Sequence, residues 1–124
     1  METKGRILVV DDEEIVRISC QRILTPMGYA VETTPDGVKA LELMGRNKYD
    51  LVLTDLKMPH MDGMEVMAEI RKREPEAKVI IITGYSTIEV AVKAIKMGAF
   101  NYIEKPFSPD VLITAVKEAL GEHA

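Results

Sequence analysis

The sequence contains one cysteine, Cys20, two histidines and no tryptophan. A single cysteine excludes an intrachain disulfide and a metal site built from a cysteine cluster. The two histidines, His60 and His123, are too few for a histidine-rich metal centre and give no obvious catalytic triad. Any chemistry that this chain performs must therefore come from carboxylates, hydroxyls and lysines.

Long apolar runs and a surplus of positive charge are lacking as well. No segment approaches the roughly 20 consecutive apolar residues that a membrane span needs, and the apolar stretch after residues 1–6 is too short for a secretory signal. The formal net charge is −4, without a basic tail or stripe, which argues against a nucleic-acid-binding surface within this chain. We therefore expect a cytoplasmic protein that contacts neither membrane nor nucleic acid directly.

The composition that remains is typical of a globular protein. Hydrophobic residues make up 47% and charged residues 29% of 124 residues, which is enough for one core in an ordinary domain. No linker, repeat or low-complexity segment divides the chain. We expect a single domain over residues 1–124.

Short apolar segments alternate with helical patterns five times along the chain, which predicts strands at 6–10, 29–34, 51–54, 79–83 and 101–104. The first, third and fourth are nearly continuous apolar runs, as in strands buried on both faces. The second and fifth include polar residues, as edge strands do. The pattern predicts an α/β fold with a doubly wound, five-stranded parallel sheet of order 2-1-3-4-5, a flavodoxin-like (βα)5 arrangement.

Helical spacing of apolar residues predicts which side of each helix packs on the sheet. The expected inward residues of the first, second, fourth and fifth helices are Val16, Cys20, Ile23, Leu24 and Met27; Val38, Leu41 and Met44; Ile88, Ala91, Val92 and Ile95; and Leu112, Ala115, Val116 and Ala119. Helix starts are indicated by Asp36, by Asp62 with Glu65, by Ser86 with Glu89, and by Ser108-Pro109. Gly28 and Gly98 stand where helices end.

Charged and hydroxyl side chains follow four of the five predicted strands. Asp11 and Asp12 follow the first strand, Asp55 follows the third, Thr83 ends the fourth, and Lys105 follows the fifth. In sheets of this order, ligands bind beyond the carboxyl ends of the strands, where strands 1 and 3 diverge. Two like charges about 4 Å apart repel by roughly 4 kcal/mol at an effective dielectric near 20, so three carboxylates need a cation. Oxygen ligands without histidine or thiolate favour Mg²⁺.

A simpler interpretation of the acidic run at 11–14 is the first turn of a helix, where the helix dipole stabilises negative charge. This interpretation suits Glu13 and Glu14. It does not explain Asp55 and Lys105, which follow other strands at the same edge of the sheet. Their joint placement favours a functional site.

Five motifs, in this order, resemble those of bacterial response-regulator receiver domains of two-component systems. They are VVDDE at 9–13, LTDLKMP at 53–59, MDG at 61–63, ITG at 82–84 and KPF at 105–107. The resemblance covers essentially the whole chain. The segments 83–85, 98–100 and 105–107 are further similar to receivers of transcriptional activators with an AAA+ module.

The resemblance implies that this chain is a phosphoacceptor signalling domain rather than an enzyme. Asp55 would accept a phosphoryl group from a sensor histidine kinase or a phosphotransfer protein. Mg²⁺ would be held by Asp11, Asp12, Asp55 and the backbone carbonyl of Lys57. Lys105 would pair with the phosphoryl oxygens.

The resemblance also implies a switch. Thr83 would hydrogen-bond the phosphoryl group, and Tyr102 occupies the family's aromatic switch position. The surface of the fourth helix, fifth strand and fifth helix would then change its partner, which is an output domain, another protein or a second copy. Lys57 and Tyr85 stand where this family tunes phosphoryl lifetime, although both are equally well explained as exposed loop residues. Lys105-Pro106 is a candidate cis peptide.

Three other functions deserve comparison. A haloacid-dehalogenase-type phosphatase needs a second aspartate two residues after its nucleophile, where this chain has Lys57. A flavodoxin-like FMN carrier needs a hydroxyl- or glycine-rich loop after the first strand, where residues 11–14 are all acidic. A receiver-like interaction module that is never phosphorylated stays open, and failure to accept a phosphoryl group would favour it.

Overall fold

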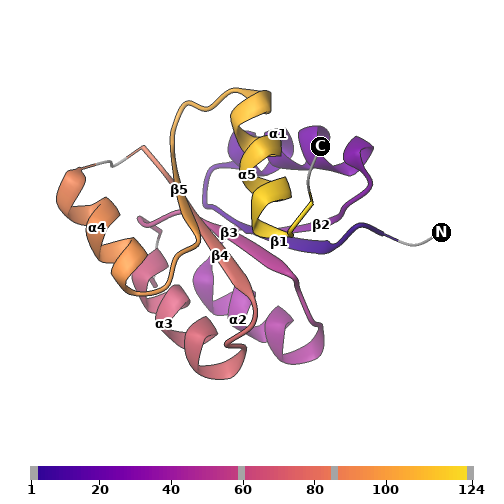
Figure 1. Ribbon diagram of the computed structural model, residues 1–124. Helices are drawn as coiled ribbons and strands as arrows, with labels where there is room; N and C mark the ends of the chain where they lie inside the picture. The colour runs from indigo at the N-terminus through magenta and orange to yellow at the C-terminus, as the bar shows by residue number, and fades with distance from the viewer. Residues whose placement is uncertain (1–2, 59–60, 85–86, 123–124) are drawn as a thin grey trace.

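The computed structural model describes residues 3–58, 61–84 and 87–122. One parallel sheet has the strand order β2-β1-β3-β4-β5, as the sequence predicted (Figure 1). The strands are β1 (Arg6–Val10), β2 (Ala30–Thr34), β3 (Leu51–Thr54), β4 (Lys78–Thr83) and β5 (Asn101–Glu104). The helices are α1 (Glu14–Leu24), the short 3₁₀ helix η1 (Thr25–Met27), α2 (Gly37–Arg46), α3 (Gly63–Arg73), α4 (Ile88–Lys96) and α5 (Pro109–Ala119).

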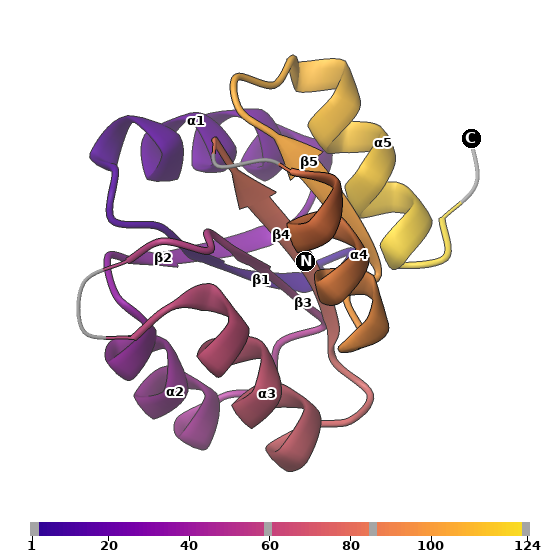
Figure 2. The same ribbon diagram turned by 90° about the vertical axis from the view of Figure 1, so that its left-hand side faces the viewer.

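Helices cover both faces of the sheet, with α1 and α5 on one side and α2, α3 and α4 on the other (Figure 2). Successive residues of a strand point to opposite faces. In β1, Ile7 and Val9 therefore join the core beneath α1 and α5, whereas Leu8 and Val10 join the core beneath α2, α3 and α4. The carboxyl ends of the strands thus emerge at one edge between two packed layers. Within the described ranges, no helix has the length and apolar character to cross a membrane.

The predicted helix boundaries are mostly confirmed. Asp36 and Ser108 are N-caps whose side chains accept hydrogen bonds from the amides three residues on, and Asp62 forms a reciprocal capping box with Glu65. Gly28 and Gly98 have φ angles of 100° and 107°, the left-handed conformation that favours glycine at a helix end. These caps, in the loops after β2, β3 and β5, fix where α2, α3 and α5 start.

The predicted inward face of α2 is partly wrong. Val38 is 51% exposed, whereas Ala40 and Met44 are buried. The apolar pattern did not predict Ala40 as a core residue, although it is fully buried on the side of α2 that faces the sheet.

The inward face predicted for α4 is wrong. Ile88, Val92 and Ile95 are exposed by 84%, 45% and 49%, while Ala94 is buried with Val90 and Met97 packed near it. Apolar residues occupy two sides of this helix, so periodicity alone could not decide which side meets the core. The N-cap is Thr87, whose side chain accepts a hydrogen bond from the Val90 amide. The predicted cap, Ser86, lies outside the described residues.

Candidate functional site

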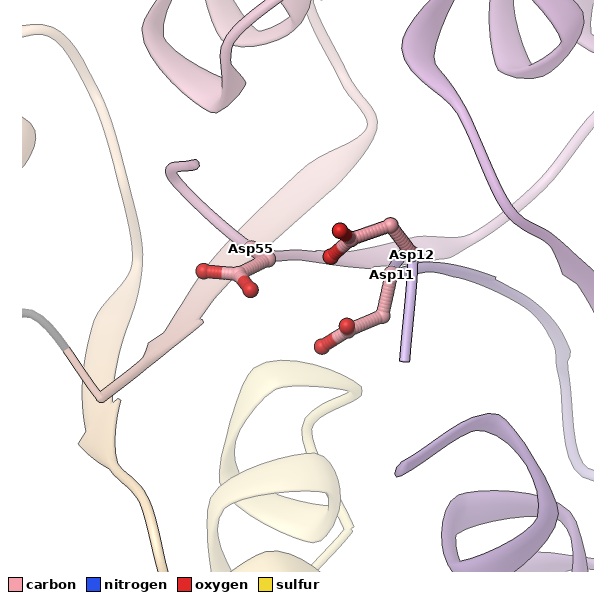
Figure 3. A group of neighbouring side chains, drawn as sticks. All are labelled: Asp11, Asp12 and Asp55. Carbon is pink, nitrogen blue, oxygen red and sulfur yellow. The ribbon is translucent and has the colours of Figure 1, made fainter. Parts of the chain in front are cut away.

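The pairing of β1 with β3 brings Asp11 and Asp55 to the same edge of the sheet. The Asp11 amide donates to the carbonyl of Thr34 at 3.1 Å, and the Asp55 amide donates to the carbonyl of Val10 at 3.0 Å. These bonds continue the sheet's hydrogen bonding one residue past each strand. Carboxylate oxygens of Asp11, Asp12 and Asp55 consequently lie within 4.8 Å of one another (Figure 3). The three predicted acidic residues therefore form one cluster.

The Asp55 carboxylate is buried, with 6% of the residue exposed. Its Oδ1 atom accepts a hydrogen bond from the Leu56 amide at 2.6 Å and a longer one from the Lys57 amide at 3.4 Å. Its Oδ2 atom accepts from Lys105 Nζ at 2.9 Å. The Thr54 hydroxyl donates to the Asp55 carbonyl at 3.0 Å. Both the backbone and the carboxylate of Asp55 are therefore held in one orientation.

Asp11 is the most deeply buried carboxylate, at 1% exposed. Its Oδ1 atom accepts from the Glu13 amide at 2.9 Å, and Arg17 donates to its backbone carbonyl at 2.7 Å. Its Oδ2 atom lies 2.8 Å from Lys105 Nζ, but among the described residues it accepts no well-oriented hydrogen bond. Burial raises the pKa of Asp11, and the nearby Lys105 ammonium and the hydrogen bond from the Glu13 amide only partly offset this effect. A buried carboxylate oxygen without a full set of donors suits a metal cation.

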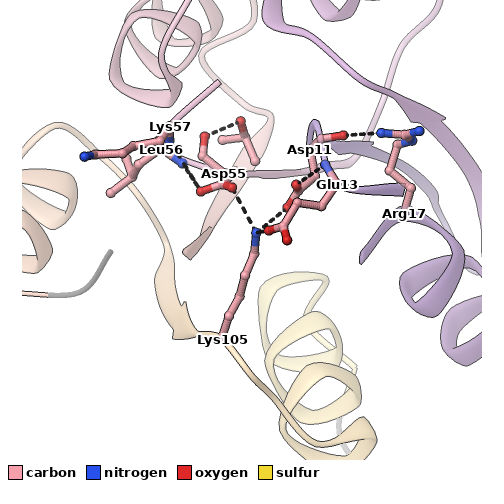
Figure 4. A network of polar contacts seen from close by, with 8 residues as sticks. Asp11, Glu13, Arg17, Asp55, Leu56, Lys57 and Lys105 are labelled. Atoms are coloured by element: carbon pink, nitrogen blue, oxygen red, sulfur yellow. Dashed lines mark hydrogen bonds and ion pairs between the residues drawn. The ribbon is translucent and has the colours of Figure 1, made fainter. Parts of the chain in front are cut away.

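Lys105 reaches the cluster from the loop after β5. Its amide donates to the Thr83 carbonyl at 2.9 Å, and the following peptide bond to Pro106 is cis, as expected. Its Nζ atom lies 2.7 Å from Glu13 Oε1, and both Asp11 and Asp55 are also within ion-pair distance (Figure 4). Burial of the ammonium opposes its charge, but the hydrogen bonds to these carboxylates outweigh it and raise the pKa of Lys105. Lys105 is therefore a fixed positive charge in the site.

The cluster still has an excess of negative charge. Four carboxylates, those of Asp11, Asp12, Glu13 and Asp55, face one ammonium, so the formal charge is −3. All the acidic ligands are oxygen atoms, which hard cations such as Mg²⁺ prefer. The donor set, the charge and the incompletely bonded Asp11 oxygen all fit a divalent cation held by Asp11, Asp12 and Asp55.

The remaining predicted residues surround this cluster. Thr83 ends β4 and is buried, and Lys57 is exposed directly after Leu56. Tyr102, on β5, is partly buried against the core that includes Ala94 of α4. Tyr85 and His60 lie outside the described residues, so their predicted roles stay predictions.

Glu13 is a site residue that the sequence pattern missed. The pattern assigned it to an ordinary acidic helix turn, and it does occupy the N-cap position of α1. Its side chain, however, makes no capping hydrogen bond and contacts Lys105 instead. Nothing in the local sequence shows this, because Lys105 comes from a loop 92 residues away.

Residues 7–117 match the family described as "Response regulator receiver domain". The chain belongs to this family. Receivers of this family are the receiver domains of two-component response regulators, and both the resemblance drawn from the motifs and the predicted fold are thereby confirmed.

Relatives and solved structures agree with this assignment. The chain is 41% identical to "Transcriptional regulatory protein GlrR" of Escherichia coli K12 over 95% of its length, and 35% identical to "DNA-binding transcriptional regulator NtrC" of the same strain over 97%. It spans only 26% of each of these relatives. A response regulator receiver domain protein from Clostridium thermocellum is 35% identical, with a TM-score of 0.88 over 94% of both chains. NtrX from Brucella abortus is 39% identical, with a TM-score of 0.90 over 94% of this chain and 27% of the other.

Proposed function

We propose that this receiver domain accepts a phosphoryl group on Asp55 from a sensor histidine kinase or a phosphotransfer protein. The observation that carries the proposal is the position of the Asp55 carboxylate, which lies next to the carboxylates of Asp11 and Asp12 and 2.9 Å from the ammonium of Lys105. Mg²⁺ would be held by these three aspartates and the backbone carbonyl of Lys57. The domain would act as a phosphoacceptor in signal transduction, without a separate substrate of its own.

The transfer forms a bond between an Asp55 carboxylate oxygen and phosphorus. It breaks the bond between phosphorus and the donor nitrogen, and the electron pair of that bond stays with the nitrogen. Negative charge on the carboxylate and on the phosphoryl oxygens opposes the approach of the two groups. When bound, Mg²⁺ would supply positive charge against this repulsion. Lys105 would also stabilise the charge on the phosphoryl oxygens, because its ammonium is already 2.9 Å from Asp55 Oδ2.

A donor protein can reach this rim from the side of α1. A groove of about 590 Å³ runs beside Lys105 and is lined by Glu13, Ile15, Gly84 and Phe107, among others. Ile15 is largely exposed there. Ile15, Val16, Ile23 and Phe107 line this groove together. An exposed group of apolar side chains bordered by charged ones is typical of a protein-binding surface, which supports a protein as phosphodonor.

Intact-protein mass spectrometry after incubation with Mg²⁺ and acetyl phosphate tests the acceptor. We expect one added phosphoryl group in the wild type, and none in Asp55→Asn or in the presence of a chelator. Asp50→Asn is the matched control, because Asp50 precedes the same strand at its opposite end, where its carboxylate accepts from the Arg6 amide. This control should be phosphorylated like the wild type.

Two outcomes would contradict the proposal. A phosphoryl group that persists in Asp55→Asn would place the acceptor elsewhere. A wild-type protein that no donor phosphorylates, whether acetyl phosphate, phosphoramidate or a phosphorylated histidine kinase, would favour a receiver-like interaction module that is never phosphorylated.

We further propose that phosphorylation changes the surface of α4, β5 and α5, which then binds an output domain or a partner protein. In support, Thr83 and Tyr102 lie on the paired strands β4 and β5, where Ile81 is opposite Tyr102 and Thr83 is opposite Glu104. Thr83 would move towards the phosphoryl group and Tyr102 would turn into the space it leaves. The exposed apolar side of α4 described above gives this surface the character of a partner-binding site.

Amide hydrogen exchange tests this switch. Phosphorylated wild type should differ from unphosphorylated protein in the exchange rates of α4 and β5. Thr83→Ala should still be phosphorylated, as measured by mass, but should lose most of this difference. A Thr83→Ala protein that shows the full difference at the same phosphorylated fraction would contradict the role of Thr83.

A further inference from the structure

The three carboxylates around Lys105 are of two kinds. Asp11 and Asp55 belong to the acidic cluster that fits a metal ion, whereas Glu13 does not. Glu13 nevertheless makes the shortest of the three contacts, with Oε1 at 2.7 Å from Lys105 Nζ, against 2.8 Å for Asp11 and 2.9 Å for Asp55. Lys105 thus has a close partner that lies outside the predicted metal ligands.

The backbone of Glu13 holds its carboxylate beside Lys105 (Figure 4). Its amide donates to Asp11 Oδ1, and its carbonyl accepts from the amides of Val16 and Arg17 in the first turn of α1. Arg17 also donates to the Asp11 carbonyl. Glu13 is therefore part of the same hydrogen-bonded turn as Asp11, and its position relative to Asp55 is set by the start of α1.

The Lys105 ammonium has only three N–H donors, and three carboxylate oxygens already surround it. A phosphoryl group on Asp55 would draw on these same donors, of which the structure directs one at Glu13 and one at Asp55. A cation held by the aspartates would offset the charges of Asp11 and Asp55, but it would leave the charge of Glu13 uncompensated. Glu13 also adds negative charge beside a group that itself carries close to two negative charges.

We infer that Glu13 is a positioning residue that holds Lys105 in the unphosphorylated site and competes with the phosphoryl group for its ammonium. This inference rests on the proposed function of Asp55 as acceptor. Glu13 keeps Lys105 directed into the acidic cluster before transfer, and it weakens the phosphorylated state afterwards. The presence of glutamate at this position therefore favours return of the domain to its unphosphorylated form.

Binding of beryllofluoride, a mimic that occupies the phosphoryl position without transfer, tests the competition in the full chain. Glu13→Gln keeps the shape of the side chain and removes its charge. Glu14→Gln is the matched control, because the neighbouring Glu14 is exposed in the same helical turn and loses the same charge. Isothermal titration calorimetry is performed first with Mg²⁺ alone and then with beryllofluoride at saturating Mg²⁺.

We expect Glu13→Gln to bind beryllofluoride about two- to fivefold more tightly than Glu14→Gln, the change expected for one half-exposed ion pair. Mg²⁺ alone should bind Glu13→Gln no more tightly than Glu14→Gln, because Glu13 is not among the ligands and its negative charge can only attract the cation. A gain in mimic affinity without a gain in Mg²⁺ affinity is a result that a merely structural role would not give. The phosphoryl group of Glu13→Gln should also be lost more slowly.

Other results overturn the inference in distinguishable ways. Equal mimic affinities in the two variants, or weaker binding by Glu13→Gln, would show that Glu13 does not compete, while the proposed function stands. A wild-type protein that neither binds beryllofluoride nor gains a phosphoryl group on Asp55 would overturn the proposed function and this inference with it.

Discussion

Gly63, the first residue of α3, packs directly against the backbone of Asp55. A Cβ atom at Gly63 would overlap the Asp55 carbonyl oxygen and would lie 2.8 Å from the Cα atom of Leu56. The Gly63 amide donates to the Leu56 carbonyl at 2.8 Å. The start of α3 therefore supports the segment that carries the proposed acceptor, and only a residue without a side chain allows this approach.

Gly63→Ala should destabilise the protein by roughly 1–3 kcal/mol, the usual cost of forcing an added group into packed structure. The atoms it meets belong to the backbone, which cannot rotate away as a side chain can. Gly45→Ala is the matched control, because Gly45 lies in α2 with open space around it, and alanine there should stabilise by about 0.5–1 kcal/mol. Urea unfolding followed by circular dichroism measures both. Equal effects of the two substitutions would contradict the packing of α3 on Asp55.

The exposed side of α4 predicts that a substitution there affects stability much less than one on the buried side of α3. Ile88→Ala should change the free energy of unfolding by less than about 0.5 kcal/mol, as is usual for exposed positions, because Ile88 buries little surface. Ile70→Ala, in the buried face of α3, should cost about 2–5 kcal/mol. The same urea experiment compares them. A large loss of stability in Ile88→Ala would show that Ile88 faces the core, as periodicity predicted.

Much of the fold was predictable because strand burial leaves a strong pattern. Continuous apolar runs in β1, β3 and β4 identified the central strands, and local capping residues such as Asp36 and Ser108 fixed helix starts. The side of α4 that faces the core was not predictable. Its sequence is apolar on two sides, and the choice depends on how the helix meets β5, which is a tertiary contact.

Part of the site could likewise be predicted from the sequence, and part could not. Asp11, Asp55 and Lys105 could be placed together from topology, because each follows a parallel strand and parallel strands end at one edge. The contact of Glu13 with Lys105 depends on the reach of a long side chain from a distant loop. Strand order carries no information about that reach.

Asp11→Asn should stabilise the protein when no divalent cation is present. Burial, assisted by the charge of Asp55, raises the pKa of Asp11 above its ordinary value, although Lys105 and the Glu13 amide oppose this. At neutral pH the ionised carboxylate is therefore less favourable in the folded than in the unfolded state, and a neutral side chain of the same shape removes that cost. Thermal unfolding in EDTA should show a higher melting temperature for Asp11→Asn than for wild type.

Adding Mg²⁺ should make the melting temperature of wild type higher than that of Asp11→Asn. A ligand that binds only the folded state raises its stability, so the melting temperature of wild type should rise with Mg²⁺ concentration, and that of Asp11→Asn should change little. A variant that is less stable than wild type in EDTA would show that the ion pair with Lys105 outweighs the cost of burying Asp11. A variant that gains as much from Mg²⁺ as wild type would exclude Asp11 as a ligand.

The buried thiol of Cys20 predicts a loss of stability at alkaline pH. Burial, with a smaller effect from the charge of Asp11, raises the pKa of Cys20 from 9.0 to about 12. Below pH 9.0 the thiol is protonated in both states, and its contribution to stability is complete. Between pH 9.0 and about 12 the unfolded chain releases this proton and the folded protein keeps it, so the free energy of unfolding falls as the pH rises. One such group contributes a slope of about 1 kcal/mol per pH unit.

Urea unfolding between pH 8 and pH 11, at about half-unit steps, measures this slope for wild type and for Cys20→Ala. Alanine leaves a small cavity and should lower the stability at every pH, so the slope is the informative quantity. The decline should be shallower in Cys20→Ala, but it should not vanish, because Tyr29, Tyr49 and Lys105 also have raised pKa values and lose stability in the same direction. Parallel curves for the two proteins would mean that the Cys20 thiol ionises equally well in the folded state, which its complete burial on the inner side of α1 does not allow.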